Sequence, residues 1–183
     1  MPKNDDKIHF ITTGGTIDSY YDGTRDTVVP YKESIIPEYL MNLELYAETI
    51  FSETTVERNF SELMMKDSRE ITKGDMQRIL DVTEASEYKK IIITQGTYTI
   101  PDTARFLKAN LTKSEKVVIL MGSFIPLKGF TPSDAPFNIG YAIAKMEHLK
   151  PGVYVCMNGR TFLPKDIAKS ISEGKYISIQ KEN

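Results

Sequence analysis

Short runs that are apolar at nearly every position recur along this chain of 183 residues. A strand with one face in water alternates apolar and polar residues, whereas a strand covered on both faces can be apolar throughout. The runs are therefore typical of parallel strands buried inside a layered domain. Five such strands are predicted, over residues 7–12, 45–51, 89–96, 115–122 and 152–158.

Between these runs the apolar residues recur with helical spacing, over residues 71–86, 99–110 and 133–150. Thr72 and Asp75 stand three residues apart, as in a capping box, and Thr99 and Asp102 repeat the arrangement. Strands that alternate with helices predict an α/β fold, with a doubly wound, mainly parallel sheet and helices on both faces. The length fits one domain over residues 1–183.

Composition excludes several classes of function. The formal net charge is −2 and the sequence pI is about 5.8, without a basic run, so the electrostatic signature of a nucleic-acid-binding protein is missing. No apolar stretch approaches the length of a membrane span, and the polar first residues lack the apolar region of a signal peptide. The single cysteine, Cys156, lies in an apolar run and is predicted to be buried and inert. We expect a cytoplasmic protein with no nucleic-acid or membrane partner.

Glycine and hydroxyl residues gather where the predicted strands end. The segments are TTGGT at residues 12–16, KDS at 66–68, TQGTYT at 94–99 and MGSF at 121–124. Ligands of parallel sheets bind beyond the carboxyl ends of the strands. Glycine allows positive φ and a close approach of the backbone to another group. The sequence thus predicts a cleft lined by hydroxyls and backbone amides.

Few kinds of chemistry suit these residues. Neither His9 nor His148 is paired with a carboxylate or thiol at a strand end, which disfavours Ser-His-Asp and Cys-His enzymes. No spaced set of His and Cys suggests a metal, and TTGGT is neither a Walker loop nor a Rossmann fingerprint, so no metal or cofactor is expected. A nucleophilic threonine with a lysine as its base remains. Less favoured is an anion cradle formed by TTGGT.

Four segments resemble, in order and spacing, the bacterial-type L-asparaginases and glutaminases. They are ITTGGTID, IIITQGTYTIPDTARFL, VVILMGSFIPLKGFTPSDAPFNIGYA and VYVCMNGRTFLPKDIAKS, beginning at residues 11, 91, 117 and 153. The resemblance covers nearly the whole chain. It implies an amidohydrolase that acts on the side-chain amide of asparagine or a related small amide through a threonine acyl-enzyme.

The resemblance also implies roles for single residues. Thr16 resembles the nucleophile, Thr97 the threonine of the second cluster, and Lys169 the lysine that acts with it as a base relay. Gly96 and the amides around Thr97 would supply the oxyanion hole. Gly15 would bring the nucleophile to the strand end, where a substrate amide can approach closely.

Substrate binding is where the chain departs from the family pattern. Ser68 resembles the serine that binds the α-carboxylate, and Arg69 beside it could grip a carboxylate with two hydrogen bonds. The family sequence His-Gly-Thr-Asp is replaced here by Gln-Gly-Thr-Tyr, ending at Tyr98. The family aspartate holds the α-ammonium, whereas a tyrosine is neutral near pH 7. We therefore expect poor affinity for free asparagine and better use of amides that carry a carboxylate but no ammonium.

Two further segments matter for the site. Residues 19–30 are polar and rich in turn residues, and predict an exposed hairpin or mobile loop. The family's loop tyrosine has no clean counterpart there: Thr27 falls near its place, and Tyr20 or Tyr21 could reach the site. Residues 165–170 read as a short helix carrying the candidate lysine.

The family's smaller C-terminal domain has no counterpart in this sequence, and we expect a natural single-domain relative. A homodimer through the sheet or helices is expected from the broad apolar helix at residues 137–146. One alternative to an enzyme stays open. The chain could be a small-ligand sensor that keeps an asparaginase-like cleft but has lost efficient catalysis, as the tyrosine in place of a substrate-gripping carboxylate suggests.

Overall fold

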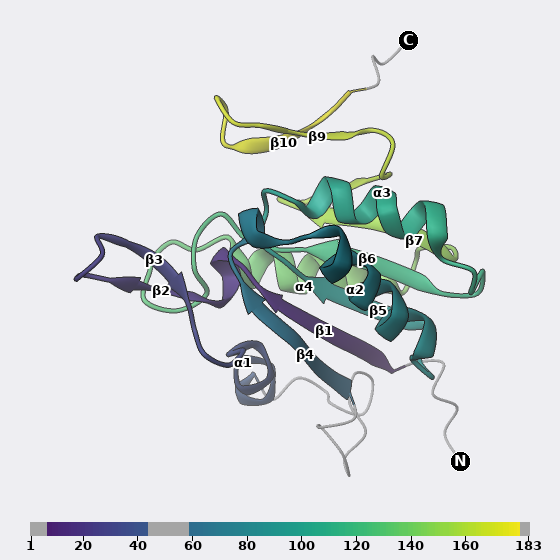
Figure 1. The fold of residues 1–183 in the computed structure, drawn as a ribbon, viewed down its shortest axis with the longest axis horizontal. Coiled ribbons are helices and arrows are strands. Elements are labelled where there is room, and N and C mark those ends of the chain that lie inside the picture. The colour runs from purple at the N-terminus through teal and green to yellow at the C-terminus, as the bar shows by residue number, and fades with distance from the viewer. Residues whose placement is uncertain (1–6, 44–58, 180–183) are drawn as a thin grey trace.

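A six-stranded sheet forms the centre of the protein (Figure 1). The structure is a computed structural model that describes residues 7–43 and 59–179. The strand predicted at residues 45–51 lies outside them. The strand order is β4 (Phe60–Lys66), β1 (Ile8–Gly14), β5 (Lys90–Thr94), β6 (Val117–Met121), β7 (Gly152–Met157) and β8 (Arg160–Phe162). The first five are parallel and β8 is antiparallel to β7. The predicted α/β architecture is confirmed.

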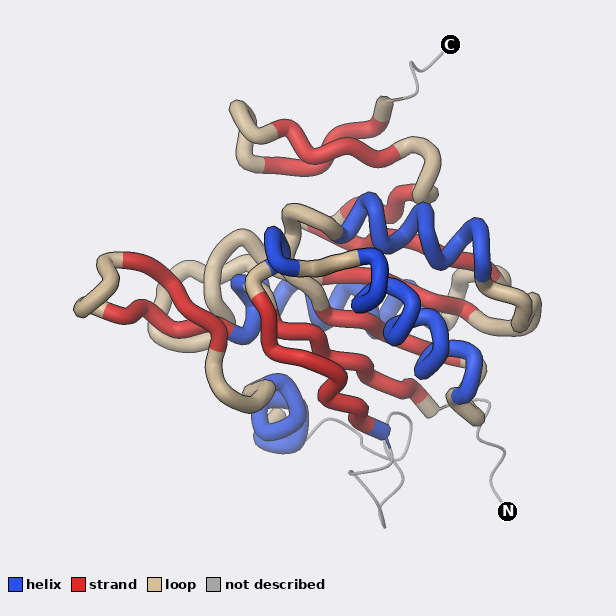
Figure 2. Tube along the Cα trace, viewed as in Figure 1, coloured by secondary structure: helices blue, strands red, loops and turns tan. Residues whose placement is uncertain are grey.

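Two hydrophobic clusters cover the two faces of the sheet, and the helices are divided between them (Figure 2). The helices are α1 (Ile36–Asn42), α2 (Lys73–Ala85), α3 (Ile100–Asn110) and α4 (Ala135–Met146). Buried residues of α2 and α3 pack with Ile91 and Ile93 of β5, whereas those of α1 and α4 pack with Ile92. Successive side chains of a strand point to opposite faces, so a strand between two helical layers is apolar at every position.

One of the two predicted capping boxes forms. At the start of α2, the Thr72 hydroxyl accepts from the Asp75 amide, and the Asp75 carboxylate accepts from the Thr72 amide. At the start of α3, Thr99 is the N-cap residue but makes no side-chain capping bond, so that prediction is wrong. The Thr99 hydroxyl instead donates to the carbonyl of Ser68 at 3.0 Å and accepts from the side-chain Nε2 of Gln95 at 2.8 Å. A tertiary contact has displaced the local one.

Two antiparallel hairpins flank the sheet (Figure 1). The first pairs β2 (Ser19–Asp22) with β3 (Thr27–Pro30), which confirms the predicted hairpin. The second pairs β9 (Ile167–Ser170) with β10 (Lys175–Ser178) and lies beside α3. The prediction of a short helix at residues 165–170 is wrong, because residues 167–170 form β9 and pair with β10. Within the described ranges, no helix is long and apolar enough to cross a membrane.

Candidate functional site

The carboxyl ends of β1, β4 and β5 meet at one point. The Gly15 amide, just after β1, donates to the carbonyl of Lys66 at the end of β4, at 2.9 Å. A Cβ atom on Gly15, whose φ is +82°, would lie 2.2 Å from the nitrogen of Gly96, and one on Gly96 would lie 2.4 Å from the Cβ of Ser68. Only glycine fits such contacts. The structure therefore brings together three of the segments predicted to form the cleft.

This meeting point is also the topological switch of the sheet. From β1 the chain moves to β4 on one side, and then crosses to β5 on the other side of β1. The loops after β1 and β5 consequently leave the sheet toward opposite faces, and ligands of such sheets bind at a point of this kind. Thr16 follows β1 and Thr97 follows β5, so both candidate threonines lie on loops that begin at this point.

Thr16 is the first residue of a short 3-10 helix (Thr16–Asp18) and is half-buried. The turn before it is fixed by Ser19, whose hydroxyl donates to the carbonyl of Gly15 at 2.8 Å. Thr16 lines a cavity of about 460 Å³, together with Val28 of β3 and residues of the segment 124–132. The predicted nucleophile thus faces a space large enough for a small ligand.

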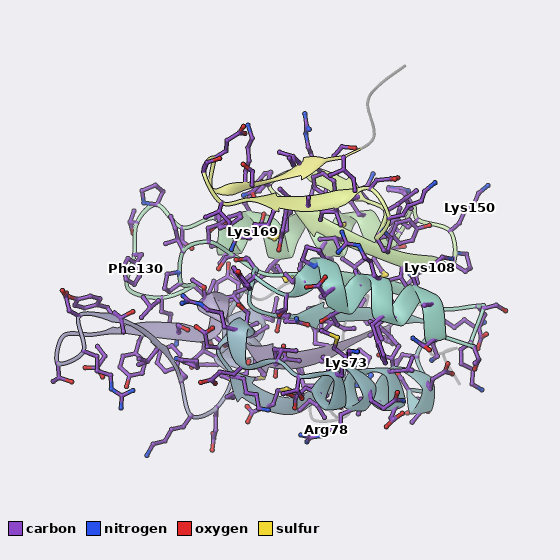
Figure 3. The ribbon with its side chains drawn as sticks, turned by 45° about the horizontal axis from the view of Figure 1, so that its top comes forward. Lys73, Arg78, Lys108, Phe130, Lys150 and Lys169 are labelled. Carbon is purple, nitrogen blue, oxygen red and sulfur yellow. The ribbon has the colours of Figure 1, made fainter. Side chains whose placement is uncertain are left out.

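Lys169 of β9 contacts the second candidate threonine directly. Its Nζ donates to Thr97 Oγ1 at 2.8 Å, across 72 residues of sequence. Figure 3 shows the lysine between the β9–β10 hairpin and the body of the domain. The ammonium also lies 5.6 Å from the ring centre of Tyr98 and 5.3 Å from that of Phe124. Burial lowers the pKa of Lys169, and the nearby positive charge of Arg69 lowers it further.

The β9–β10 hairpin is held in place by two hydrogen bonds that sequence reasoning missed. The buried hydroxyl of Tyr176, in β10, donates to the carbonyl of Thr97. Arg105 of α3 donates to the carbonyl of Ile167 in β9 at 2.6 Å. Both bonds join residues more than sixty positions apart, and no local pattern signals them. They position Lys169 against Thr97.

Ser68, at the start of a 3-10 helix (Ser68–Glu70), is buried, and its hydroxyl accepts from the Tyr98 amide at 3.3 Å. Arg69 is placed differently. Its side chain is 78% exposed, and its Nε lies 3.7 Å from Asp67, whose carboxylate also accepts from the Arg69 amide. The serine is thus buried beside Tyr98, whereas the guanidinium is exposed to solvent.

Tyr98 is half exposed, with 51% of its surface accessible. Its ring lies against the Lys169 ammonium, and the two residues line a second cavity of about 240 Å³ beside α3. The hairpin tyrosines point elsewhere: Tyr21 donates to Asp26, and Tyr20 packs on Tyr31 at 5.1 Å between ring centres. The hairpin residue that lines the Thr16 cavity is a valine.

Phe124 was not singled out from the sequence, yet it contributes to both halves of the site. It lines the Thr16 cavity, and its ring lies near Lys169. Asp134, at the start of α4, fixes it, because this carboxylate accepts from the Phe124 amide at 3.0 Å and from the Ile125 amide at 2.9 Å. The signal that could have found Phe124 is its place directly after a strand end, in MGSF.

His9 and Cys156 lie in the core, whereas His148 is exposed. The ring nitrogens of His9 lie 2.9 Å from the Ser86 hydroxyl and 2.8 Å from the Ser61 hydroxyl. Burial raises the pKa of the Cys156 thiol to about 11, as expected for an inert cysteine. In the part of the chain that the structure describes, no group of three or more His, Cys, Asp and Glu side chains could hold a metal ion.

Comparison with known proteins identifies the family. Residues 7–176 match the family model described as asparaginase, N-terminal. The chain belongs to the asparaginase family. Among curated proteins, the chain is 30% identical over 99 residues to a glutaminase-asparaginase of Acinetobacter glutaminasificans. The matched segment covers 52% of this chain and 29% of that protein. A glutaminase-asparaginase of Pseudomonas fluorescens biotype A is 29% identical over the same length, covering 52% and 27%.

Solved asparaginase structures share the fold. The probable cytoplasmic L-asparaginase from Campylobacter jejuni superimposes with a TM-score of 0.77 at 23% identity, over 95% of this chain and 53% of its own. The thermostable L-asparaginase from Thermococcus kodakarensis gives a TM-score of 0.72 at 25% identity, over 96% and 52%. The chain thus spans about half the length of these structures, and the 99 residues that match the curated relatives cover under a third of each of them.

Proposed function

We propose that this chain is an amidohydrolase that hydrolyses the side-chain amide of asparagine or a related small amide, with Thr16 as the nucleophile. The observation that supports the proposal most is the 2.8 Å contact of Lys169 with Thr97, beside the point where Gly15 packs on Gly96. A threonine and a lysine from segments 72 residues apart are placed together at the strand ends where ligands of such sheets bind.

In the proposed reaction, Thr16 Oγ1 attacks the amide carbon, and ammonia leaves with the proton of the hydroxyl. Water then attacks the resulting ester and releases the carboxylic acid. Lys169 acts as the base through Thr97, which requires its neutral form. Burial and the charge of Arg69 both lower the pKa of Lys169, and so favour that form. The backbone amides around Gly96 would stabilise the oxyanion.

Ammonia release from a panel of small amides tests the proposal. We expect Thr16→Val, which removes the hydroxyl and keeps the shape, to abolish release without unfolding the domain. Lys169→Met should lower kcat by about a hundredfold or more, as is typical when a general base is lost. Lys108→Met, an exposed lysine on α3, is the matched control and should not change the rate. Folded protein that releases no ammonia from any amide contradicts the proposal.

Specificity follows from Tyr98. Tyr98 is neutral near pH 7 and gives an ammonium at this position no countercharge, so succinamic acid, which lacks the ammonium, should be a better substrate than asparagine. Ser68 remains available for the carboxylate that both compounds share. Tyr98→Asp should shift the ratio of kcat/KM toward asparagine. A tenfold preference of the unmodified protein for asparagine, or an unchanged ratio in Tyr98→Asp, would show that Tyr98 is not at the ammonium position.

A binding domain without efficient catalysis is the second candidate, and the placement of Tyr98 favours it. The Tyr98 ring lies 5.6 Å from the Lys169 ammonium, at the position where the family pattern has a carboxylate. Calorimetry separates the two candidates: heat of binding without turnover supports a sensor, and rapid ammonia release supports the hydrolase.

A further inference from the structure

The cavity beside Thr16 has walls that do not suit a free amino acid. Val28 lines it from the hairpin, and Phe124 and Phe130 line it from the segment after β6. None of the described residues that line it is charged. A zwitterion would lose its hydration there without gaining an ionic partner. An aromatic or aliphatic group would instead remove apolar surface from water.

Hydrogen bonds fix the wall of this cavity before any ligand arrives. The Asp134 carboxylate holds the amides of Phe124 and Ile125, and the Leu127 amide donates to the carbonyl of Ile17 at 3.2 Å, next to Thr16. Phe130 lies further along the same loop, beside the β2–β3 hairpin (Figure 3). A preformed apolar cavity of about 460 Å³ has the size and lining of a small-molecule site.

We propose that the amide hydrolysed at Thr16 carries an apolar substituent of aromatic size next to its reacting group, and that this substituent occupies the cavity of Val28, Phe124 and Phe130. This inference rests on the proposed function, because it takes amide hydrolysis at Thr16 as the reaction. Atoms balance as in simple amide hydrolysis: the C–N bond breaks, the acyl group passes to Thr16 Oγ1 and then to water, and nitrogen leaves as ammonia. The cavity decides which amides are accepted.

Benzylsuccinate and succinate provide a binding test that does not depend on catalysis. Both are dicarboxylates, and hydrolysis of either 2- or 3-benzylsuccinamic acid would give benzylsuccinate. Calorimetry should show benzylsuccinate binding the unmodified protein at least about tenfold more tightly than succinate. Phe130→Ser should remove most of that ratio. Phe137→Ser is the matched control, because this phenylalanine is 59% exposed on α4 and does not line the cavity.

Ammonia release from 2- and 3-benzylsuccinamic acid, compared with succinamic acid, provides the second arm. We expect at least one benzyl isomer to have a kcat/KM about tenfold higher, and Phe130→Ser to reduce that advantage. Equal binding of benzylsuccinate and succinate would overturn the apolar substituent, whether or not the amides are hydrolysed. Tighter binding of benzylsuccinate with no ammonia from any amide would support the apolar subsite and overturn the hydrolase.

Discussion

At the scale of single residues, a close contact requires glycine at position 96, whereas at position 15 a close contact and a positive φ both require it. Gly96→Ala would place a methyl group 2.4 Å from the Cβ of Ser68. Overpacking of this kind costs about 1–3 kcal/mol, and we expect a loss of stability in that range and reduced ammonia release. Gly140→Ala is the matched control, because Gly140 lies inside α4 with open space around it. Alanine there should stabilise by about 0.5–1 kcal/mol. Urea unfolding measures both, and equal effects would contradict the steric argument.

Two buried ionisable residues should give opposite pH dependences. Burial, and then the charge of Lys116, lowers the pKa of His9 from 6.5 to about 4. Between these values the unfolded chain binds a proton that the folded chain does not, so His9 makes the protein less stable as the pH falls. Burial raises the pKa of Asp18 from 3.8 to about 6, although Ile35 and Ser34 donate hydrogen bonds to it. Asp18 therefore makes the protein less stable as the pH rises through the same range.

Single substitutions should separate these two effects. His9→Gln leaves only the Asp18 contribution of the pair, so its free energy of unfolding should fall relative to the unmodified protein as the pH rises from about 4 to 6.5. Asp18→Asn should show the reverse difference, because only His9 then titrates. Each difference should reach about 2–3 kcal/mol across the range. Urea unfolding at several pH values measures them, and profiles parallel to the unmodified protein would show that neither group controls stability.

At the scale of elements, the β9–β10 hairpin owes its place to contacts with α3 and with Thr97 in the loop after β5. Tyr176→Phe removes the donor to the Thr97 carbonyl and should cost about 1–3 kcal/mol, because a buried acceptor loses its partner. Amide exchange in β9 and β10 should speed up, and ammonia release should fall as Lys169 loses its position. Tyr154→Phe is the control, since its hydroxyl bonds to the Lys150 carbonyl at an exposed place. Equal exchange rates in both variants would count against the anchoring role.

At the scale of the whole molecule, the homodimer stays a prediction. The apolar face of α4 that suggested it is used within the chain, since Ile139, Ala142 and Met146 are buried against the sheet. Phe137 remains exposed on the same helix. Light scattering over a range of concentrations should give about twice the monomer mass of 20.8 kDa. A constant mass near that of one chain would refute the dimer.

The sequence alone indicated the elements of the sheet that are buried on both faces, together with the glycines at their ends. Four of the five predicted strands correspond to β1, β5, β6 and β7, because a strand between two helical layers must be apolar throughout. The edge strand β4 was not predicted, since only Met64 of its residues is buried and its pattern is mixed.

Contacts between distant segments were decided by the tertiary structure. The family resemblance implied that Lys169 acts with Thr97, but the pairing of β9 with β10 and the docking of that hairpin on α3 are what bring the two residues into contact. Phe124 and Val28 line the cavity beside Thr16 because a loop and a hairpin meet there. Periodicity reports whether a residue faces the core of its own element. It carries no information about which side chain of another element lies opposite, because that depends on how the layers pack.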